Sequence, residues 1–274
     1  MNLSNVSKTA IITLRSHVIE AHRRPPLIHD PMAAVCLERL HALAKDAAVQ
    51  QIFERKLSRV LTSHIAIRAR QYDAIVNTYI AAHPGCTVIN LGCGFDTRFW
   101  RIDNRNCRYI DLDLPAVIEL KQAVLADELE YEVIGASVLD VAWIDQVTAT
   151  NNRQFVLVAE GLFMYLPRPA VIELFQQVAA KFADSQLVFE VVTEKYTRGL
   201  WKKIVEMKFR SEMGVDAGAA YNFGVKRGAE IEDFAPGLKV INEWSFVDDA
   251  DVYPRILKYM GLARTQWTVT AAIN

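Results

Sequence analysis

The chain has 274 residues, a length that suits one large domain or a core with a cap. Its apolar content of 51% is ample for a buried core, and its net charge of -1 gives no electrostatic basis for general nucleic-acid binding. It contains no run of about 18 apolar residues, so we expect no membrane span.

The N-terminal sequence MNLSNVSKTAIITLRSH has only a short apolar patch and no plausible signal-peptide cleavage site. The four cysteines are scattered without C-x-x-C spacing, which argues against a zinc site. We therefore predict a reduced, cytoplasmic protein without a metal.

The first 84 residues have helical patterns. These patterns lie at about 8–23 and 51–83, and a further helix can begin at Asp30-Pro31, with the proline in its first turn. We predict that residues 1–84 form an N-terminal helical cap on a core that spans residues 85–274.

From residue 87 onward, strand-like and helical segments alternate. The strand-like segments lie at 87–92, 108–113, 131–137, 155–160 and 187–192, and the helical ones at about 115–127, 140–147 and 168–183. Apolar, β-branched strands separated by helices predict a buried parallel sheet.

The pattern changes after the fifth strand. Residues 195–236 are helix-like and then Gly-rich, with interspersed aromatic residues, and we predict that they form a lid over the carboxyl edge of the sheet. Strand-like runs follow at 239–246 and 264–274, separated by an expected helix at about 248–260. Seven strands that end in a hairpin-like pair fit a methyltransferase fold better than a six-stranded NAD-binding Rossmann domain.

The segment TVINLGCGFDTRFWR, at 87–101, has the strongest functional pattern. An apolar strand leads into Gly92-Cys93-Gly94, where glycines let backbone amides approach a ligand closely. The next strand ends at Asp113, 19 residues after Gly94, a suitable offset for a carboxylate that holds the hydroxyls of a ribose.

The same turn differs from a dinucleotide fingerprint. Thr97 stands where the third glycine would be, and Asp96 would place a negative charge beside a pyrophosphate. We therefore predict a site for a nucleoside without phosphates, and S-adenosylmethionine is the commonest such cofactor.

Glu160 and Tyr165 follow the fourth strand in FVLVAEGLFMYLP. A carboxylate there can pair with the ammonium or sulfonium group of the cofactor, because ligands bind beyond the carboxyl ends of such strands. Alternatively, Glu160 is a strand-end residue that faces water. Tyr165 either lines the methyl-transfer pocket or packs its ring on the core.

Ser137 and Val138 end the third strand, where adenine meets this kind of sheet. Arg68 lies on the apolar stripe of the long N-terminal helical pattern, where a guanidinium needs an anionic partner. That partner is either a bound carboxylate or an acidic residue of the domain. Arg70 and Asp73 lie elsewhere on the helix, and we expect them to form a solvated pair.

All six histidines lie within the first 83 residues, and none stands at a strand tip. A carboxylic acid acceptor needs no general base because it is ionised at pH 7, whereas a phenol or alcohol generally does. Carboxyl methylation is thus slightly favoured, although the N-terminal helix can present a histidine to the site.

Three motifs resemble those of the leucine carboxyl methyltransferase family: NLGCGFDTRFWR, YIDLDLPAVIELK and LVAEGLFMYLP. The closer resemblance is to its bacterial branch, the polyketide O-methyltransferases of the tetracenomycin type. The segments SKTAIITLRSH and IAIRARQYDAIV are also similar to that branch. The resemblance covers residues 8 to about 192, and residues 195–274 match only in layout.

The resemblance implies an α/β fold of the class I S-adenosylmethionine-dependent methyltransferases, with a Rossmann-like sheet of seven strands. It also implies a role for each matching residue. Arg68 would bind the carboxylate of the cofactor, Gly92 would contact it at the glycine turn, Asp113 would bind its ribose, Ser137 and Val138 would meet adenine, and Glu160 would be the acid after strand four.

Two departures from the family pattern bear on the substrate. The eukaryotic leucine carboxyl enzymes have aspartate where Ser137 stands, so adenine recognition here would rely on the backbone. Those enzymes also have a basic residue that binds the cofactor, upstream of an aspartate-proline pair that corresponds to Asp30-Pro31 here. Arg15 is one candidate for the equivalent residue in this chain. Both departures favour a small-molecule acceptor over a protein phosphatase.

The sequence thus predicts an S-adenosylmethionine-dependent O-methyltransferase that acts on a carboxyl, phenol or hydroxyl group of a small molecule. A polyketide-type metabolite is the expected kind of acceptor. Two alternatives are a nicotinamide-dependent oxidoreductase and a cofactor-binding module without catalysis. The sequence does not fix the acceptor or the oligomeric state.

Overall fold

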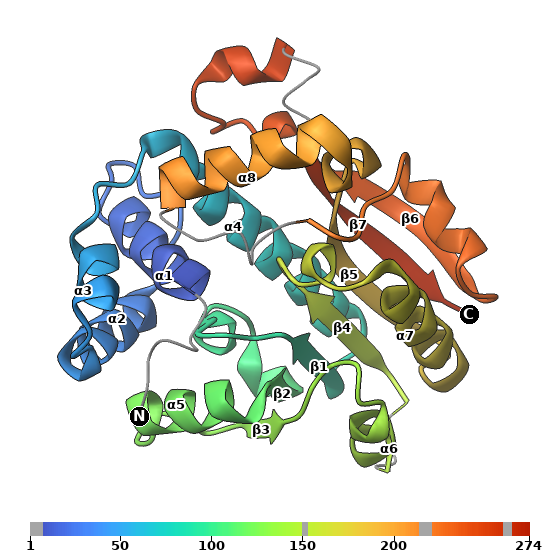
Figure 1. Ribbon diagram of the computed structural model, residues 1–274. Coiled ribbons are helices and arrows are strands. Elements are labelled where there is room, and N and C mark those ends of the chain that lie inside the picture. Colours follow the sequence, from blue (N-terminus) through green and yellow to red (C-terminus); the bar gives the residue numbers. More distant parts are fainter. Residues whose placement is uncertain (1–7, 150–152, 214–220, 260–264) are drawn as a thin grey trace.

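A seven-stranded sheet forms the centre of the molecule (Figure 1). The computed structural model describes residues 8–149, 153–213, 221–259 and 265–274. The strands are β1 (Cys86–Leu91), β2 (Cys107–Asp113), β3 (Glu132–Gly135), β4 (Phe155–Ala159), β5 (Ser185–Val192), β6 (Leu238–Trp244) and β7 (Gln266–Ile273). All seven predicted strands are present.

The strand order is β3-β2-β1-β4-β5-β7-β6. Strands β1 to β5 are parallel, and β7 runs antiparallel between β5 and β6. The predicted mixed α/β fold with a late antiparallel pair is confirmed. The order reverses between β1 and β4, and ligands bind at such a switch point, beyond the carboxyl ends of the strands.

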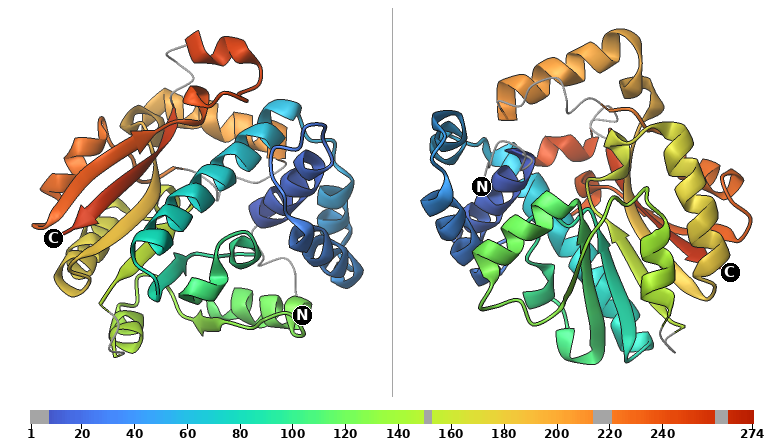
Figure 2. Two further views of the ribbon diagram at one scale, coloured as in Figure 1. Left: turned by 180° about the vertical axis from the view of Figure 1, so that it is seen from behind. Right: turned by 60° about the horizontal axis from the view of Figure 1, so that its bottom comes forward.

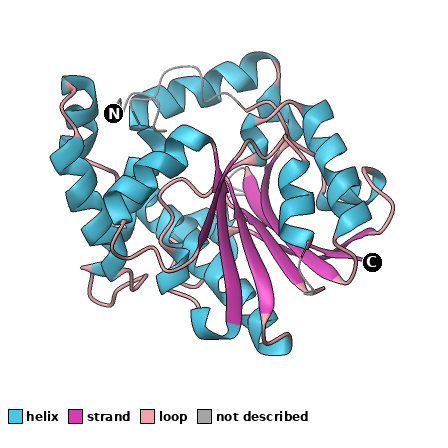
Figure 3. Cartoon of the chain, turned by 90° about the horizontal axis from the view of Figure 1, so that it is seen from below, coloured by secondary structure: helices cyan, strands magenta, loops and turns pink. Residues whose placement is uncertain are grey.

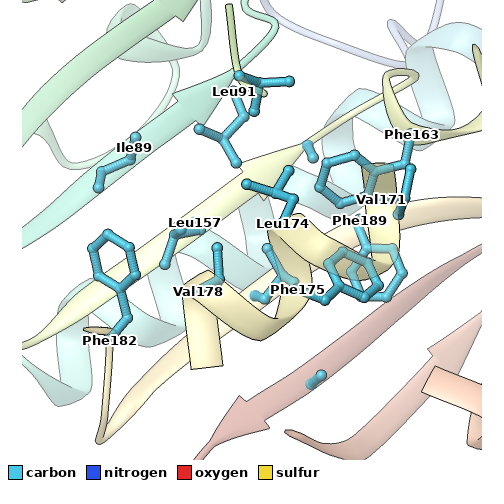
Figure 4. Packing of buried hydrophobic residues seen from close by; sticks show 14 of the residues in the cluster. Ile89, Leu91, Leu157, Phe163, Val171, Leu174, Phe175, Val178, Phe182 and Phe189 are labelled. Atoms are coloured by element: carbon cyan, nitrogen blue, oxygen red, sulfur yellow. The ribbon is translucent and has the colours of Figure 1, made fainter. Parts of the chain in front are cut away.

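Helices cover both faces of the sheet (Figure 3). The long helix α4 (Arg59–Ala82) lies along one face of the sheet, as the view from behind shows (Figure 2), and its Tyr72, Val76 and Ile80 pack there against strand residues. On the other face, α6 (Ala142–Thr148) and α7 (Arg168–Lys181) pack against apolar strand residues and a group of phenylalanines (Figure 4).

Three N-terminal helices gather beside the sheet. They are α1 (Lys8–Ala21), α2 (Pro31–Leu43) and α3 (Ala47–Glu54), and they share an apolar cluster with α5 (Pro115–Leu125). Helix α2 begins as predicted, with Asp30 as its N-cap and Pro31 in its first turn. We call α1 to α3 the cap; the division into a helical cap at 1–84 and a core at 85–274 stays a prediction.

Two helical predictions need correction. The pattern at 51–83 is divided between α3 and α4, because the Ser58 hydroxyl accepts a hydrogen bond from the Leu61 amide and begins a new helix. The helix expected at 248–260 is wrong: over the described residues 246–259, the helical structure consists of the short 3-10 segments Phe246–Asp248 and Arg255–Tyr259. Pro254 explains this difference, since proline disfavours helical backbone at the preceding residue.

The predicted lid contains one long helix, α8 (Gly199–Met213). It crosses above the carboxyl ends of β4 and β5 and reaches α1 (Figure 1). Part of the Gly-rich stretch, at 214–220, lies outside the described residues. The position of α8 fits a cover over the sheet edge, and its action as a lid stays a prediction.

Candidate functional site

The glycine turn after β1 and the acid at the end of β2 meet directly. Gly92 and Gly94 have φ angles of +65° and +50°, which glycine adopts without the penalty of a side chain. A Cβ on Gly92 would also lie 2.8 Å from Leu162 Cδ1. The turn therefore needs glycine for its backbone shape, and at Gly92 also for space.

Asp113 is held rigidly beside this turn. Its Oδ2 accepts a hydrogen bond from the Gly94 amide at 2.7 Å, and its Oδ1 accepts one from the Leu114 amide at 2.7 Å. Burial raises the pKa of the Asp113 carboxyl, and the two amides partly offset that effect. Each oxygen keeps acceptor capacity for a further donor, such as a ribose hydroxyl.

Asp96 faces inward rather than toward a ligand phosphate. Its Oδ2 pairs with Arg98 Nη1 at 2.6 Å, and its Oδ1 pairs with Arg101 Nη2 at 3.2 Å. The arginines hold the pKa of the Asp96 carboxyl well below its usual range, although burial opposes them. Its charge is thus compensated, and the argument against a pyrophosphate rests on Thr97 in place of the third glycine.

Arg68 projects from α4 onto the carboxyl ends of β4 and β5. Its Nε donates to Glu160 Oε1 at 2.8 Å, and its Nη1 donates to Glu190 Oε2 at 3.1 Å. Of the two partners expected for Arg68, a bound carboxylate or an acidic residue of the domain, the structure shows the second. The Arg68 side chain still exposes 14% of its surface, so a ligand can also reach it.

Glu160 joins two arginines. Besides Arg68, it pairs with Arg98 Nη2. Burial acts to raise the pKa of Glu160, but the two arginines outweigh it and hold the pKa below its usual range. The alternative of a strand-end glutamate that faces water does not hold, since only 12% of its side chain is exposed.

Glu190, inside β5, was not singled out from the sequence. It is 2% exposed, and burial raises the pKa of its carboxyl despite the contact with Arg68. The sequence does contain a signal for it: Glu190 interrupts the apolar run LVFEVV, and a carboxylate buried in such a run needs a partner.

A buried ion network connects the cap to the glycine turn. Its members are Asp30, Asp73, Asp96, Glu160, Arg98 and Arg101, joined by ion pairs throughout. Arg98 is fully buried, and it links α4, the turn and the end of β4. The expected solvated pair of Arg70 and Asp73 is wrong: Asp73 belongs to this network, and Arg70 pairs with Asp249 and Asp251.

The strand-three residues lie next to Asp113. Asp113 pairs in register with Gly135, and Ser137 follows two residues later. The Ser137 hydroxyl accepts a hydrogen bond from the Leu139 amide at 3.2 Å, and the buried Val138 offers its carbonyl to Trp143 Nε1 at 3.0 Å. Both side chains shape the end of this strand.

Tyr165 faces a second tyrosine. Its ring centroid lies 5.9 Å from that of Tyr221, which follows the predicted lid helix. Burial and the nearby Glu190 raise the pKa of Tyr165 to about 12. The phenol is therefore neutral at pH 7 and can donate a hydrogen bond.

Two further sequence candidates lie within the cap. Arg15 Nη1 donates to the Ile52 carbonyl, so this nitrogen serves cap packing. His17 bonds Asp30 through Nδ1 at 2.9 Å and is 2% exposed, so it is a member of the buried interior rather than a base open to substrate.

Two negative findings apply to the described residues. No group of three or more potential metal-ligating side chains gathers within them. No helix there is both long and apolar enough to cross a membrane.

A family model described as "Leucine carboxyl methyltransferase" matches residues 10–179. Among curated proteins, the chain is 28% identical to "Tetracenomycin polyketide synthesis O-methyltransferase TcmP" of Streptomyces glaucescens, over 95% of this chain and 91% of that protein. It is 25% identical to "S-adenosyl-L-methionine-dependent methyltransferase dpfgK" of Gibberella zeae, over 96% of this chain and 89% of that protein.

Two solved structures share the fold at low sequence identity. A DUF574 family protein from Streptomyces avermitilis superposes with a TM-score of 0.53 at 12% identity, covering 96% of this chain and 97% of that one. A protein from Bordetella parapertussis, described as possibly exported, superposes with a TM-score of 0.50 at 14% identity, covering 99% and 98%. These likenesses concern the fold alone.

Proposed function

The chain belongs to the leucine carboxyl methyltransferase family, and we propose that it transfers a methyl group from S-adenosylmethionine to an oxygen atom of a small molecule. The observation that carries this proposal is the arrangement of Asp113 and Arg68 along one sheet edge. Asp113 offers acceptor capacity at the glycine turn, and Arg68 lies at the ends of β4 and β5. A nucleoside with a charged amino-acid tail fits these two groups.

The charge of this edge favours a cationic ligand. Besides Asp113, six carboxylates lie around it, and the four basic partners that these six contact are Arg68, Arg98, Arg101 and Lys121; the six are Asp30, Asp73, Asp96, Asp111, Glu160 and Glu190. The acidic excess attracts a sulfonium more than a neutral thioether.

Each predicted residue can take one part of the cofactor. Asp113 would accept hydrogen bonds from the ribose hydroxyls, and Arg68 would pair with the terminal carboxylate. Glu160 would accept a hydrogen bond from the ammonium group. Ser137 and Val138 would border the adenine beside β3, and the amides of Gly92 and Gly94 would approach the ligand at the turn.

Bound S-adenosylmethionine would supply a methyl group on a sulfonium, a good leaving group. The protein then has to align an acceptor oxygen with that methyl group, and such positioning contributes roughly 7–11 kcal/mol. Tyr165 and Tyr221 would border the acceptor pocket, where the neutral Tyr165 phenol can donate a hydrogen bond to the acceptor.

The acceptor class is the finer part of the proposal. The name of the Streptomyces glaucescens relative refers to tetracenomycin polyketide synthesis, which supports aromatic acids and phenols of the polyketide kind as first candidates. The cysteines at 36, 86, 93 and 107 are free thiols, which supports action in the cytoplasm.

Thermal unfolding with S-adenosylmethionine, S-adenosylhomocysteine and NAD, each added separately, tests the cofactor class. A ligand at 100 times its dissociation constant stabilises the folded state by about 2.7 kcal/mol. That corresponds to roughly 5–10 °C for a chain of this size. We expect a shift with the two adenosyl compounds alone, whereas a shift with NAD alone would support an oxidoreductase.

Turnover then tests the reaction itself. We expect transfer of a labelled methyl group to at least one member of a panel of carboxylic acids and phenols. Cofactor binding without transfer to any acceptor class would instead support the non-catalytic module.

A further inference from the structure

Glu190 is a buried carboxylate on β5, beside the proposed cofactor site. The proposed function gives it no role in cofactor binding or in methyl transfer. Glu190 is 2% exposed and lies in a strand whose other residues are nearly all apolar and buried. Its Oε2 accepts a hydrogen bond from Arg68 Nη1 at 3.1 Å, and Gln266 on β7 also hydrogen-bonds this carboxyl.

Such a residue is costly for folding. An ionised carboxylate loses its hydration when it is buried, and one ion pair rarely compensates for that loss fully. The charge of Glu160 on the same guanidinium makes the ionised form of Glu190 still less favourable. A leucine or methionine of similar volume would suit the stability of β5 better, so stability alone does not explain the carboxylate.

The geometry of Arg68 suggests what the carboxylate does. Glu160 holds Arg68 Nε and Glu190 holds Arg68 Nη1, which fixes two of the three nitrogens of a planar group. The third nitrogen, Nη2, meets no acceptor within the described part of the chain. It lies beside Gly161, where a Cβ would be 3.9 Å from Nη2 and also 3.9 Å from Glu190 Oε2.

We propose that Glu190 is a positioning residue, which acts with Glu160 to fix the Arg68 guanidinium so that Nη2 stays presented to the carboxylate of the cofactor. Without Glu190, the guanidinium keeps a single protein contact at Nε and can turn about its last side-chain bond. This inference rests on the proposed function, because it assumes a ligand with a terminal carboxylate.

The test compares two ligands that differ only at the amino-acid end. S-adenosylhomocysteine has the terminal carboxylate and ammonium, whereas 5′-methylthioadenosine has the same nucleoside and thioether without them. We expect Glu190→Gln to weaken binding of S-adenosylhomocysteine roughly 10- to 100-fold, the range for a hydrogen bond to a charged group. Binding of 5′-methylthioadenosine should be unchanged, as measured by calorimetric titration.

A matched variant controls for the loss of a negative charge near the sheet edge. Glu194 follows β5 and pairs with the exposed Arg198, away from the contacts of Arg68. Glu194→Gln should leave the affinity for both ligands as in the wild type. Glu190→Asp is a second variant of the site; it keeps the charge but shortens the side chain, and should produce a smaller loss with the same ligand selectivity.

The outcomes separate the two levels of the argument. A wild-type protein that binds neither adenosyl ligand would contradict the proposed function, and this inference with it. Wild-type binding together with an equal loss of both ligands in Glu190→Gln and Glu190→Asp would show a purely structural role. Unchanged affinity in both variants would also overturn the positioning role.

Discussion

At the scale of single residues, the site depends on groups whose position allows little substitution. Asp113 uses one oxygen for the Gly94 amide and the other for the Leu114 amide, so its orientation is fixed before any ligand arrives. An asparagine has one acceptor oxygen and cannot keep both bonds. The residue thus combines a structural and a binding task.

Asp113→Asn should therefore weaken S-adenosylhomocysteine binding by roughly 10-fold or more, because one ribose contact and its charge are lost. Asp145→Asn makes the same chemical change at a 73% exposed side chain on α6, which pairs with Lys181, and should bind like wild type. Fluorescence or calorimetric titration of both variants checks this. Equal affinity of Asp113→Asn and wild type would remove Asp113 from the site.

Gly161 permits a second comparison at this scale. Gly161 and Gly85 have φ angles of +66° and +83°, so alanine at either position should cost about 1–2 kcal/mol of unfolding free energy. A Cβ on Gly85 meets no atom within 4 Å, whereas one on Gly161 would fill the space beside Arg68 Nη2. We expect weaker S-adenosylhomocysteine binding only in Gly161→Ala.

Urea unfolding and ligand titration of both glycine variants measure these two effects separately. If both variants bound the ligand like wild type, the space above Gly161 would have no part in cofactor binding.

The spacing of the sequence is enough to find some of these residues and not others. Asp113 and the glycine turn are local features, since the strand and the turn fix their offset. Glu190 and Arg98 acquire their roles only where α4, the turn, β4 and β5 converge. No spacing along the chain encodes that convergence. For the same reason, the sequence does not decide whether Arg68 pairs with a bound carboxylate or with an acidic residue of the domain.

At the scale of elements, a buried ion pair and a partly exposed one tie the cap to the core in the described part of the chain. Arg101 joins Asp30, the N-cap of α2, to the glycine-turn segment, with 3% and 0% of the two side chains exposed. Arg39 on α2 joins Glu128, which follows α5, at the surface. Both pairs join the cap to the core, so they make a matched comparison.

Arg101→Met should lower the unfolding free energy by about 3–5 kcal/mol, because three buried carboxylates, Asp30, Asp73 and Asp96, each lose one cationic partner. Arg39→Met should lower it by about 1 kcal/mol or less, because solvent reaches and screens this partly exposed pair. Urea denaturation measures both changes. Similar effects of the two substitutions would show that burial does not determine how the cap is held.

Element boundaries show where sequence patterns have limits. The strand-like patterns located all seven strands: β1, β2, β4, β5 and β7 are largely buried, whereas the edge strands β3 and β6 are partly exposed. The break between α3 and α4 depends on one capping hydroxyl, that of Ser58, within a continuous helical pattern. The segment at 248–260 has a helical composition, but Pro254 interrupts it.

At the scale of the whole molecule, buried charge is concentrated where the cap, α4 and the carboxyl ends of the strands meet. Phe175 and Phe182 lie in the apolar packing on the opposite face of the sheet (Figure 4). Apolar packing stabilises both faces of the sheet, whereas the buried ion pairs gather near the carboxyl ends of the strands on the side of α4. Stability should therefore respond to pH mainly through these ion pairs.

The direction of this response follows from the carboxylates with shifted pKa values. The pKa values of Asp30, Asp96 and Glu160 lie below their usual range in the folded protein. Their stabilisation is therefore present above the unfolded pKa values, about 4, and is lost as the pH falls through the lower folded values. Asp113 and Glu190 have raised pKa values and act in the opposite sense, since their protonated forms favour the folded state.

Three buried carboxylates with lowered pKa values oppose two with raised values, and arginines contact all three of the lowered group. We therefore expect the unfolding free energy to fall as the pH decreases from about 5 to about 2. Urea denaturation across that range checks this, with 0.5 M salt as a control because salt screens exposed pairs far more than buried ones. Arg101→Met should show a shallower decline, since it lacks one of the charges that lower the pKa values of Asp30 and Asp96. A wild-type stability that stayed constant down to pH 2 would contradict this account of the buried network.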